Sequence, residues 1–426
     1  MELDIKDFLL SYEISNKISR ADIEDEIKEM TKVMRDGSLE NPSSIPMIPT
    51  HITIDDIQRS SLETSIVAMA IDIGGTNTRI STIRKDEHGH LIVSLHKVFP
   101  TPGKDHDIST HCFCNAIADQ ATEFMNAISY VGICFSFASK QDEHFGATVI
   151  AGGKQIKFTD IIGKCIDKEL AIAFKEHGIK RELYISVIND ASAVLLGVAA
   201  CFPSTSTLYI GVILGTGFNI SYTDPAKQCI VNTEVGGYRG FPVNSIDQQL
   251  FFSTIDPDID WCEKMVSGEY LGKLCTFYLL TAAKEGYIKL NRIFTEQNAL
   301  LSEDISGILE KGVQSPLLNK LCSDKQNCLN VISIIESIVD RAAFFVASSV
   351  AATMVFCGSC EKYNKFKICV EGSLYKHLFS FNKRVSNWLT IITDAYPSIH
   401  YEITDIPNST LIGAYQLSNI QMLHSL

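Results

Sequence analysis

Two short stretches, far apart in the chain, repeat one pattern of an apolar strand, a Gly-Thr turn and a second strand. The first runs from Ile71 to Ser81 and the second from Val212 to Ser221. A turn of this kind directs backbone N–H groups and a hydroxyl into one concavity, which suits a phosphate. Two such hairpins therefore indicate two halves of the chain that grip one polyphosphate.

The hairpins match neither of the common nucleotide-binding glycine loops. A Walker A loop closes with Lys-Ser/Thr before a helix, and a dinucleotide fingerprint also opens a helix. Here Gly74-Gly75-Thr76 leads into a strand instead. A single glycine-rich hairpin is more often only a tight turn, so the likeness between the two is what favours ligand binding.

The length and charge of the chain narrow its class. A chain of 426 residues predicts two domains, and 46% hydrophobic with 20% charged residues is typical of soluble globular proteins. The net charge of −13 argues against nucleic acid or an anionic membrane as a general partner. It does not exclude one anionic ligand held by backbone amides.

Several features predict a reducing, cytoplasmic location without membrane insertion. The 13 cysteines form no regular framework, and we interpret Cys357-Gly-Ser-Cys360 and Cys112-Phe-Cys114 as plain thiols. The N-terminus is acidic and lacks the basic region of a signal peptide. The longest apolar run, Ala342 to Cys357, is too short for a membrane span and predicts a buried helix.

The hydrophobic pattern predicts alternating strand-rich and helical regions. Strands are expected at 67–73, 78–84, 91–98, 131–137, 182–188, 208–214, 218–222 and 366–370. Helices are expected at 23–35, 108–129, 191–200, 263–283, 332–356 and 411–423. The stretch 36–49, rich in Ser, Pro and Asn, is typical of a solvent-facing connector.

Eight motifs follow one another along the chain. They are Met47-Ile-Pro-Thr50, Asp72 to Arg79, Phe135-Ser-Phe-Ala-Ser-Lys-Gln141, Asn189-Asp190, Gly215-Thr-Gly217, Asn232-Thr-Glu234-Val-Gly236, Cys262 to Gly272 and Glu371-Gly-Ser-Leu-Tyr-Lys376. In this order they resemble the signature segments of the hexokinase family, within the actin-like sugar kinase superfamily. The run Glu263-Lys-Met-Val-Ser-Gly268 is the most specific of them.

The resemblance implies an α/β fold of two ribonuclease-H-like (actin-like ATPase) domains that flank a cleft. The small domain would comprise residues 62–189 together with 409–426, and the large domain residues 1–61 and 190–408. Each hairpin then belongs to one domain, so that Mg²⁺ and ATP are bridged between the two. We expect a hexose as substrate, no nucleic-acid partner, and a monomer or homodimer.

The implied reaction is phosphorylation of a hexose, with glucose expected, at its 6-hydroxyl by ATP, the first step of glycolysis. Asp190 closes a predicted strand, where a carboxylate can accept the proton of the attacking hydroxyl. The alternative is that Asn189-Asp190 only caps the following helix. By resemblance Asp72 would hold Mg²⁺ through water, or else would bond only to its own turn.

The remaining site residues are assigned by resemblance. The phosphates would contact Gly74, Gly75, Thr76, Asn77, Arg79, Gly215, Thr216 and Gly217; the adenosine would contact Gly372 and Ser373; the sugar would contact Ser136, Lys154, Asn189, Asn232, Glu234 and Glu263. Arg79 could instead lie on the solvent face of its sheet, and Glu263 could be an exposed helix residue. Gly372-Ser373 could serve only as a strand-to-helix turn.

The chain departs from the family pattern in the sugar loop, where Gly152-Gly153-Lys154 replaces W-T-K. Ala138 and Val235 replace a Pro and a Trp, and the C-terminal D-G-S-G-x-G-A-A becomes Asn408 to Tyr415. These changes favour kinase chemistry more strongly than glucose as the sugar. The main alternative is a sugar-sensing or regulatory protein on a hexokinase fold. An actin-like or chaperone ATPase is a third possibility that the sugar motifs do not support.

Overall fold

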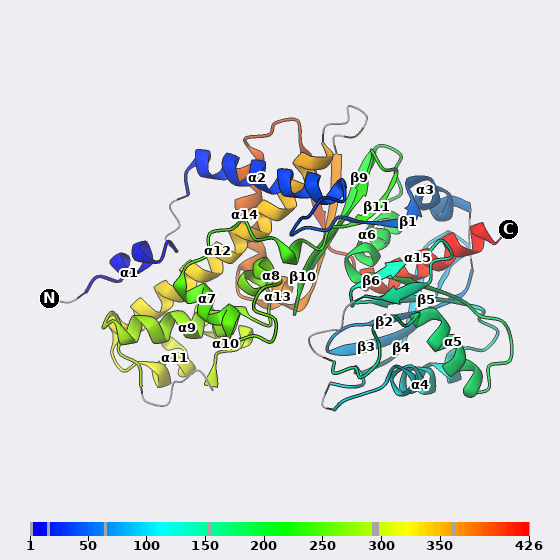
Figure 1. Cartoon of the computed structure of the whole chain (residues 1–426), viewed down its shortest axis with the longest axis horizontal. Helices are drawn as coiled ribbons and strands as arrows, with labels where there is room; N and C mark the ends of the chain where they lie inside the picture. The colour runs from blue at the N-terminus through cyan, green and yellow to red at the C-terminus, as the bar shows by residue number, and fades with distance from the viewer. Residues whose placement is uncertain are drawn as a thin grey trace.

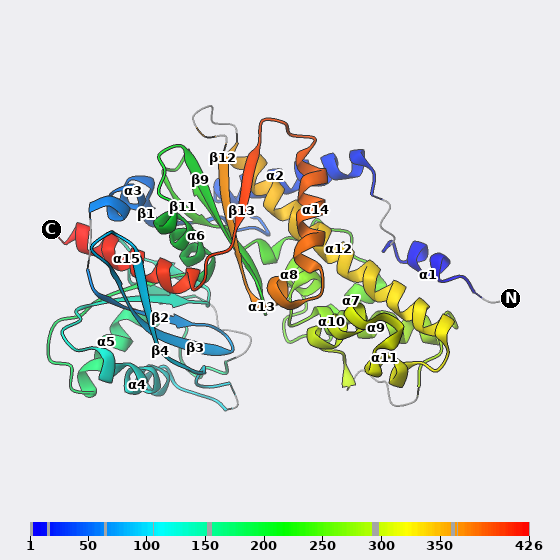
Figure 2. The ribbon, with the colours of Figure 1, turned by 180° about the vertical axis from the view of Figure 1, so that it is seen from behind.

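The computed structural model describes residues 3–14, 18–63, 66–104, 106–150, 156–291, 298–358, 363 and 365–425, with side chains 61–63 left out. Its framework is two mixed sheets (Figures 1 and 2). The six-stranded large sheet has the order β1 (Ile48–Thr53), β11 (Cys229–Asn232), β10 (Phe218–Asp224), β9 (Thr207–Leu214), β12 (Lys365–Glu371) and β13 (His400–Thr404). The five-stranded small sheet has the order β4 (Leu91–Pro100), β3 (Asn77–Lys85), β2 (Ala68–Ile73), β5 (Tyr130–Phe135) and β8 (Tyr184–Ile188).

The two sheets share one topology. In the small sheet β2, β3 and β4 pair antiparallel, and β5 and β8 then follow parallel to β2. In the large sheet β9, β10 and β11 pair antiparallel, and β12 and β13 follow parallel to β9. The glycine hairpins β2–β3 and β9–β10 are therefore equivalent elements. This repeat confirms the predicted α/β fold of two related halves.

Helices surround the sheets on both sides. Around the small sheet lie α4 (Thr110–Ala121) and α5 (Ile166–Glu176), with a short hairpin of β6 (Ser139–Gln141) and β7 (Ala147–Val149), whereas α3 (Ile54–Glu63) contacts β1, α6 and α15. The rest are α1 (Ile5–Ser11), α2 (Arg20–Ser38), α7 (Ser245–Phe252), α8 (Trp261–Val266), α9 (Leu271–Lys284), α10 (Ser302–Lys311), α11 (Pro316–Leu321), α12 (Lys325–Cys357), α13 (Ser373–His377) and α14 (Phe381–Thr393). The long helix α12 is the centre of this second group and is largely buried, as predicted (Figure 1). No helix in the described ranges is both long and apolar enough to cross a bilayer.

Two helices, α6 (Asp190–Cys201) and α15 (Ser409–His424), connect the sheets (Figure 2). Helix α6 packs on β9, β10 and β12, while α15 packs on α6 and on β2, β5 and β8. A Cβ on Gly413 would lie 1.8 Å from the Ala193 carbonyl oxygen, and one on Gly132 would lie 1.9 Å from that of Ala414. Only glycine permits this close approach.

We propose the domain division given by the sequence, 62–189 with 409–426 and 1–61 with 190–408. It is supported by the sheets, because all strands of the small sheet fall in the first part and all strands of the large sheet fall in the second.

Some predicted elements need correction. The helix predicted at 263–283 is two helices, α8 and α9, because Gly268 leaves the helix and its N–H donates to the Gly215 carbonyl at 2.8 Å. The helix predicted at 108–129 ends at Ala121 and continues as a 3₁₀ turn. The connector predicted at 36–49 is not solvent-facing throughout, since Ile45 and Met47 are buried and β1 begins at Ile48.

The cysteines are free thiols where the structure describes them. Cys114 and Cys357 are buried, whereas Cys112 is exposed. Cys360 of the C-x-x-C lies outside the described residues.

Candidate active site

The predicted base, Asp190, stands where the small sheet meets the connecting helix. Strand β8 ends at Ile188, and Asn189 is the N-cap of α6, its side-chain oxygen accepting the Ala191 N–H at 3.0 Å. Asp190 accepts the same N–H at 2.8 Å and also a hydrogen bond from the Ser136 hydroxyl. Both side chains therefore accept the N–H at the start of α6, and the Asp190 carboxylate contacts Ser136 as well.

The surroundings of Asp190 tune its acidity. Burial raises its pKa to about 6, against the opposing hydrogen bonds from Ser136 and Ala191, and the charges of Asp72 and Glu263 raise it further. A carboxyl group with this pKa is ionised at neutral pH and is still basic enough to accept a proton from a hydroxyl.

This pKa predicts an acidic limb in the pH profile of kcat/KM. Asp190 must be deprotonated to act as a base, so activity should rise as the pH increases through about 6 and should fall about tenfold per unit below that value. Initial rates measured from about pH 4.5 to 8 would show it. A plateau that continues down to about pH 4.5 would contradict the assignment, because it would imply an unperturbed carboxyl.

Polar side chains form a continuous network beside Asp190. The Asn219 amide on β10 donates to the Asn232 side-chain oxygen at 2.9 Å and to Glu234 Oε1 at 3.3 Å. The Asn232 amide donates to the same Glu234 oxygen at 2.7 Å. Asn219 also approaches the Asn189 side-chain oxygen at 3.5 Å. Carboxylate and amide groups fixed in this way can form hydrogen bonds with the hydroxyls of a polyol and so distinguish their positions.

Glu234 occupies an unusual backbone position in this network. Its φ of 54° lies in the left-handed region, which a non-glycine residue adopts rarely and mostly at functional sites. Burial raises its pKa to about 7, the Asn232 hydrogen bond opposes the rise, and the charges of Asp190 and Glu263 add to it.

Asn219 is a member of this network that was not predicted from the sequence. The sequence does carry one indication of its role, because polar Asn219 and Ser221 alternate along β10. Every residue of that strand is buried. Two polar side chains on one face of a buried strand need partners, and here both contact Asn232.

Glu263 is not an exposed helix residue. From α8 its Oε2 accepts the Phe218 N–H at 3.1 Å, and a Cβ on Gly217 would lie 2.9 Å from the same oxygen. The carboxylate therefore lies against the second glycine hairpin, and its charge acts on both Asp190 and Glu234.

Asp72 lies at the end of β2, paired across the hairpin with Arg79 of β3. Its Oδ2 accepts hydrogen bonds from both Arg79 Nε, at 2.9 Å, and Arg79 Nη2. The Thr410 hydroxyl of α15 donates to the same oxygen at 2.9 Å. Arg79 is thus directed at Asp72 rather than at solvent.

The two glycine turns differ in exposure. Gly74 N–H donates to the Asn77 carbonyl at 3.1 Å, and Gly75, Thr76 and Asn77 reach the surface. In the second turn Gly215 N–H donates to the Gly217 carbonyl at 3.0 Å, and Gly215 itself is buried.

The second turn meets the predicted adenosine motif. A Cβ on Gly215 would lie 3.4 Å from Gly372 Cα, and Gly372 has a φ of 136° that side chains rarely adopt. Ser373 begins α13 and is exposed. Ser267, next to Gly268, is fully buried and its hydroxyl has no hydrogen-bond partner among the described residues. A glycine-lined turn with an unsatisfied buried hydroxyl beside it fits a nucleotide.

Protein side chains can supply only some of the ligands that Mg²⁺ needs in this site. The described ranges contain no group of three or more His, Cys, Asp or Glu that could hold a metal. Mg²⁺ commonly uses one or two carboxylates together with substrate phosphates and water, which fits a single Asp72. Since Asp72 Oδ2 is already bonded to Arg79 and Thr410, a water-mediated contact fits better than direct coordination.

The structure brings Ser136, Asn189, Asp190, Asn232, Glu234 and Glu263 into one group of mutual contacts and charges. Lys154, together with Gly152 and Gly153, lies outside the described residues.

The repeated sheet topology, with α6 and α15 between the two sheets, defines a two-domain, actin-like sugar kinase fold. Two models of the hexokinase family match the chain, one over residues 9–200 and the other over residues 209–417. The chain therefore belongs to the hexokinase family.

Individual relatives agree with this assignment. The chain is 26% identical to Hexokinase-1 of Rattus norvegicus over 418 residues, covering 89% of this chain but 44% of that protein. It is 24% identical to Hexokinase-7 of Oryza sativa subsp. japonica over 391 residues, covering 82% and 83%. The chain thus spans less than half the length of the mammalian relatives and most of the rice protein.

Solved structures support the fold. A hexokinase from Schistosoma mansoni complexed with glucose superposes with a TM-score of 0.81 at 19% identity, covering 97% of this chain and 98% of that one. A ROK family glucokinase from Streptomyces griseus, in complex with glucose and AMPPNP, gives a TM-score of 0.52 at 17% identity, covering 83% and 99%.

Proposed function

We propose that this protein phosphorylates a hexose at its 6-hydroxyl with ATP, as a hexokinase at the first step of glycolysis. The observation that carries the proposal is Asp190, a rigidly held carboxylate with a pKa raised to about 6, beside a network of amides and carboxylates. Family membership and the glucose-bound structural relative support a sugar as the acceptor.

Each group has a defined task in this reaction. Ser136 and the Ala191 N–H orient the Asp190 carboxylate, which accepts the proton of the attacking hydroxyl. The network of Asn189, Asn219, Asn232 and Glu234 binds the other hydroxyls. A sugar that lacks one of them leaves a buried polar group unpaired, which gives strong discrimination.

The two glycine turns would hold the nucleotide, with Gly372 and Ser373 at its adenosine end. Mg²⁺, when bound, neutralises the phosphate charge that develops during transfer. Asp72 would help to hold it through water, while the hydrogen bond from Arg79 holds the Asp72 carboxylate in place.

The test is ADP release measured with glucose, fructose, mannose and no sugar, in the presence of Mg²⁺ and ATP. We expect release that depends on at least one hexose. Sugar binding without ADP release for any hexose would overturn the proposal and favour the sugar-sensing alternative. Equal ADP release without sugar would instead indicate an ATPase.

Asn219 offers a separate prediction. Asn219→Ala removes the amide that donates to both Asn232 and Glu234, so the KM for the sugar should rise about 10- to 100-fold, since a lost polar contact of this kind costs about 1.4–3 kcal/mol. Steady-state kinetics with varied sugar would measure it. The exposed Asn41→Ala is the matched control and should leave KM unchanged. An unchanged KM in Asn219→Ala would remove Asn219 from the sugar site.

A further inference from the structure

Two buried cysteines meet at the junction between α11 and α12. The sulfurs of Cys322 and Cys328 lie 2.8 Å apart, which is close enough for one thiol to donate to the other. Cys322 is 1% exposed and Cys328 is 4% exposed. Neither thiol has a part in the proposed catalytic site. We call these two residues the junction pair.

The local backbone brings the two sulfurs together. Cys322 follows α11 with an extended backbone, at φ −143° and ψ 152°. The chain then turns at Asp324, the N-cap of α12, whose carboxylate accepts the Asn327 N–H at 2.8 Å. Cys328 lies in the first turn of α12, and its N–H donates to the Asp324 carbonyl at 3.0 Å. This turn returns the chain to Cys322, so that the two side chains meet.

A neighbouring segment holds the turn in place. The Lys289 N–H donates to the Asn327 side-chain oxygen at 2.8 Å. The Asn291 N–H donates to the Leu321 carbonyl at 3.0 Å. These bonds fix the backbone next to each cysteine, and the fold therefore keeps the two sulfurs as neighbours.

The junction pair lies directly beneath a surface turn. Residues 323–326, which lie between the two cysteines, are all exposed. Burial and the neighbouring Cys328 thiol raise the pKa of Cys322, so its reactive thiolate is scarce and its reactions are slow. Local opening of this short turn is enough to expose both sulfurs to a small reagent.

We propose that the junction pair is a redox site, which a low-molecular-weight disulfide such as oxidised glutathione converts reversibly into a disulfide bond. The thiolate of one cysteine attacks a glutathione sulfur, which forms a mixed disulfide and releases one glutathione. The thiolate of the other cysteine then attacks the mixed disulfide, which forms the Cys322–Cys328 bond and releases the second glutathione. The chain loses two electrons and two protons, and oxidised glutathione gains them to become two thiols. This site is independent of the proposed catalytic function.

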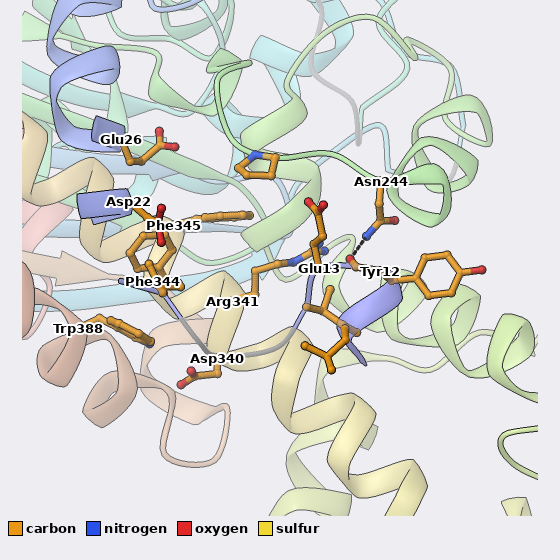
Figure 3. Close-up of a pocket in the computed structure, with 14 residues that line it drawn as sticks. Tyr12, Glu13, Asp22, Glu26, Asn244, Asp340, Arg341, Phe344, Phe345 and Trp388 are labelled. Carbon is orange, nitrogen blue, oxygen red and sulfur yellow. Dashed lines mark hydrogen bonds between the residues drawn. The ribbon is translucent and has the colours of Figure 1, made fainter. Parts of the chain in front are cut away.

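The disulfide constrains only the start of α12. The middle of the helix is anchored separately at Arg341, which is labelled in Figure 3 and donates to both oxygens of the buried Asp247, at 3.0 and 2.7 Å. A cross-link across a short loop makes local opening of that loop rarer. We expect amide hydrogen exchange to slow at least about tenfold at 321–328 and to stay unchanged around Arg341. Equal exchange at 321–328 in the reduced and oxidised chains would contradict this constraint.

The test is incubation of the reduced full chain with oxidised glutathione, followed by alkylation of the remaining thiols, digestion with trypsin and mass spectrometry. Trypsin cleaves after Lys325, so the two cysteines fall on separate peptides, 321–325 and 326–341. We expect these two peptides to be joined by a disulfide and to be separated again by dithiothreitol.

Cys112 and Cys114 are the matched control pair. They are closer together in the sequence, but they lie two residues apart on α4, where side chains do not face each other. Cys112 is exposed and Cys114 is buried. We expect glutathione on Cys112, which shows that the oxidant has acted, and no bond between Cys112 and Cys114. Glutathione on Cys112 without joined junction peptides would overturn the proposal, and so would equal cross-linking of the two pairs.

Discussion

Asp190→Ala should lower kcat about 10²- to 10⁴-fold while the sugar still binds, since loss of a general base removes an effect of this size. The carboxylate would accept the proton in the transition state, whereas the amides and Glu234 would hold the sugar in its ground state. The loss should therefore appear in kcat rather than in KM. Steady-state ADP release and equilibrium sugar binding measure the two quantities separately.

Asp190→Asn is the isosteric control. It keeps the size of the side chain and an oxygen that can accept the Ala191 N–H, but it cannot accept a proton at neutral pH, so its kcat should be as low as that of the Ala variant. Near-normal turnover in either variant would mean that another group is the base. A variant that loses both turnover and sugar binding would instead place Asp190 in sugar recognition.

Gly413→Val should have the largest effect on stability. The added Cβ would lie 1.8 Å from the Ala193 carbonyl, far inside van der Waals contact, so α6 and α15 would have to separate. Because α15 also packs on β2 and β5 of the small sheet, and α6 packs on β9 and β12 of the large sheet, the separation would reach both sheets. We expect a loss of about 3 kcal/mol or more in the free energy of unfolding, measured by denaturant titration.

Gly307→Ala is the control for that experiment. Gly307 lies in α10 with nothing within 4 Å of an added Cβ, so alanine should stabilise the helix by up to about 1 kcal/mol. Similar stability of Gly413→Val and the unaltered chain would contradict the proposed role of the α6–α15 contact.

The sequence predicted the duplicated core well, for a physical reason. Gly74-Gly75-Thr76 and Gly215-Thr216-Gly217 lie in turns between paired strands, where local residues alone determine the geometry. The strand patterns around them were equally local. The glycine hairpin that is repeated in the sequence therefore corresponds to the topology that is repeated in the two sheets.

Contacts between distant segments could not be predicted in the same way. The break between α8 and α9 follows from the hydrogen bond that the Gly268 N–H donates to the Gly215 carbonyl. Asp72 accepts a hydrogen bond from Thr410, which is far away in the sequence. Neither pairing is visible in a local pattern. Asn219 was missed because its role depends on Asn232 and Glu234, which reach it only through the fold.

The central claim is that the chain transfers a phosphoryl group from ATP to a hexose with Asp190 as the base. Its most direct test is mass spectrometry of the sugar after incubation of the full chain and of Asp190→Ala with Mg²⁺, ATP and the hexose. We expect hexose 6-phosphate with the unaltered chain and almost none with the variant. Unphosphorylated sugar with both proteins, or equal product with both, would contradict it.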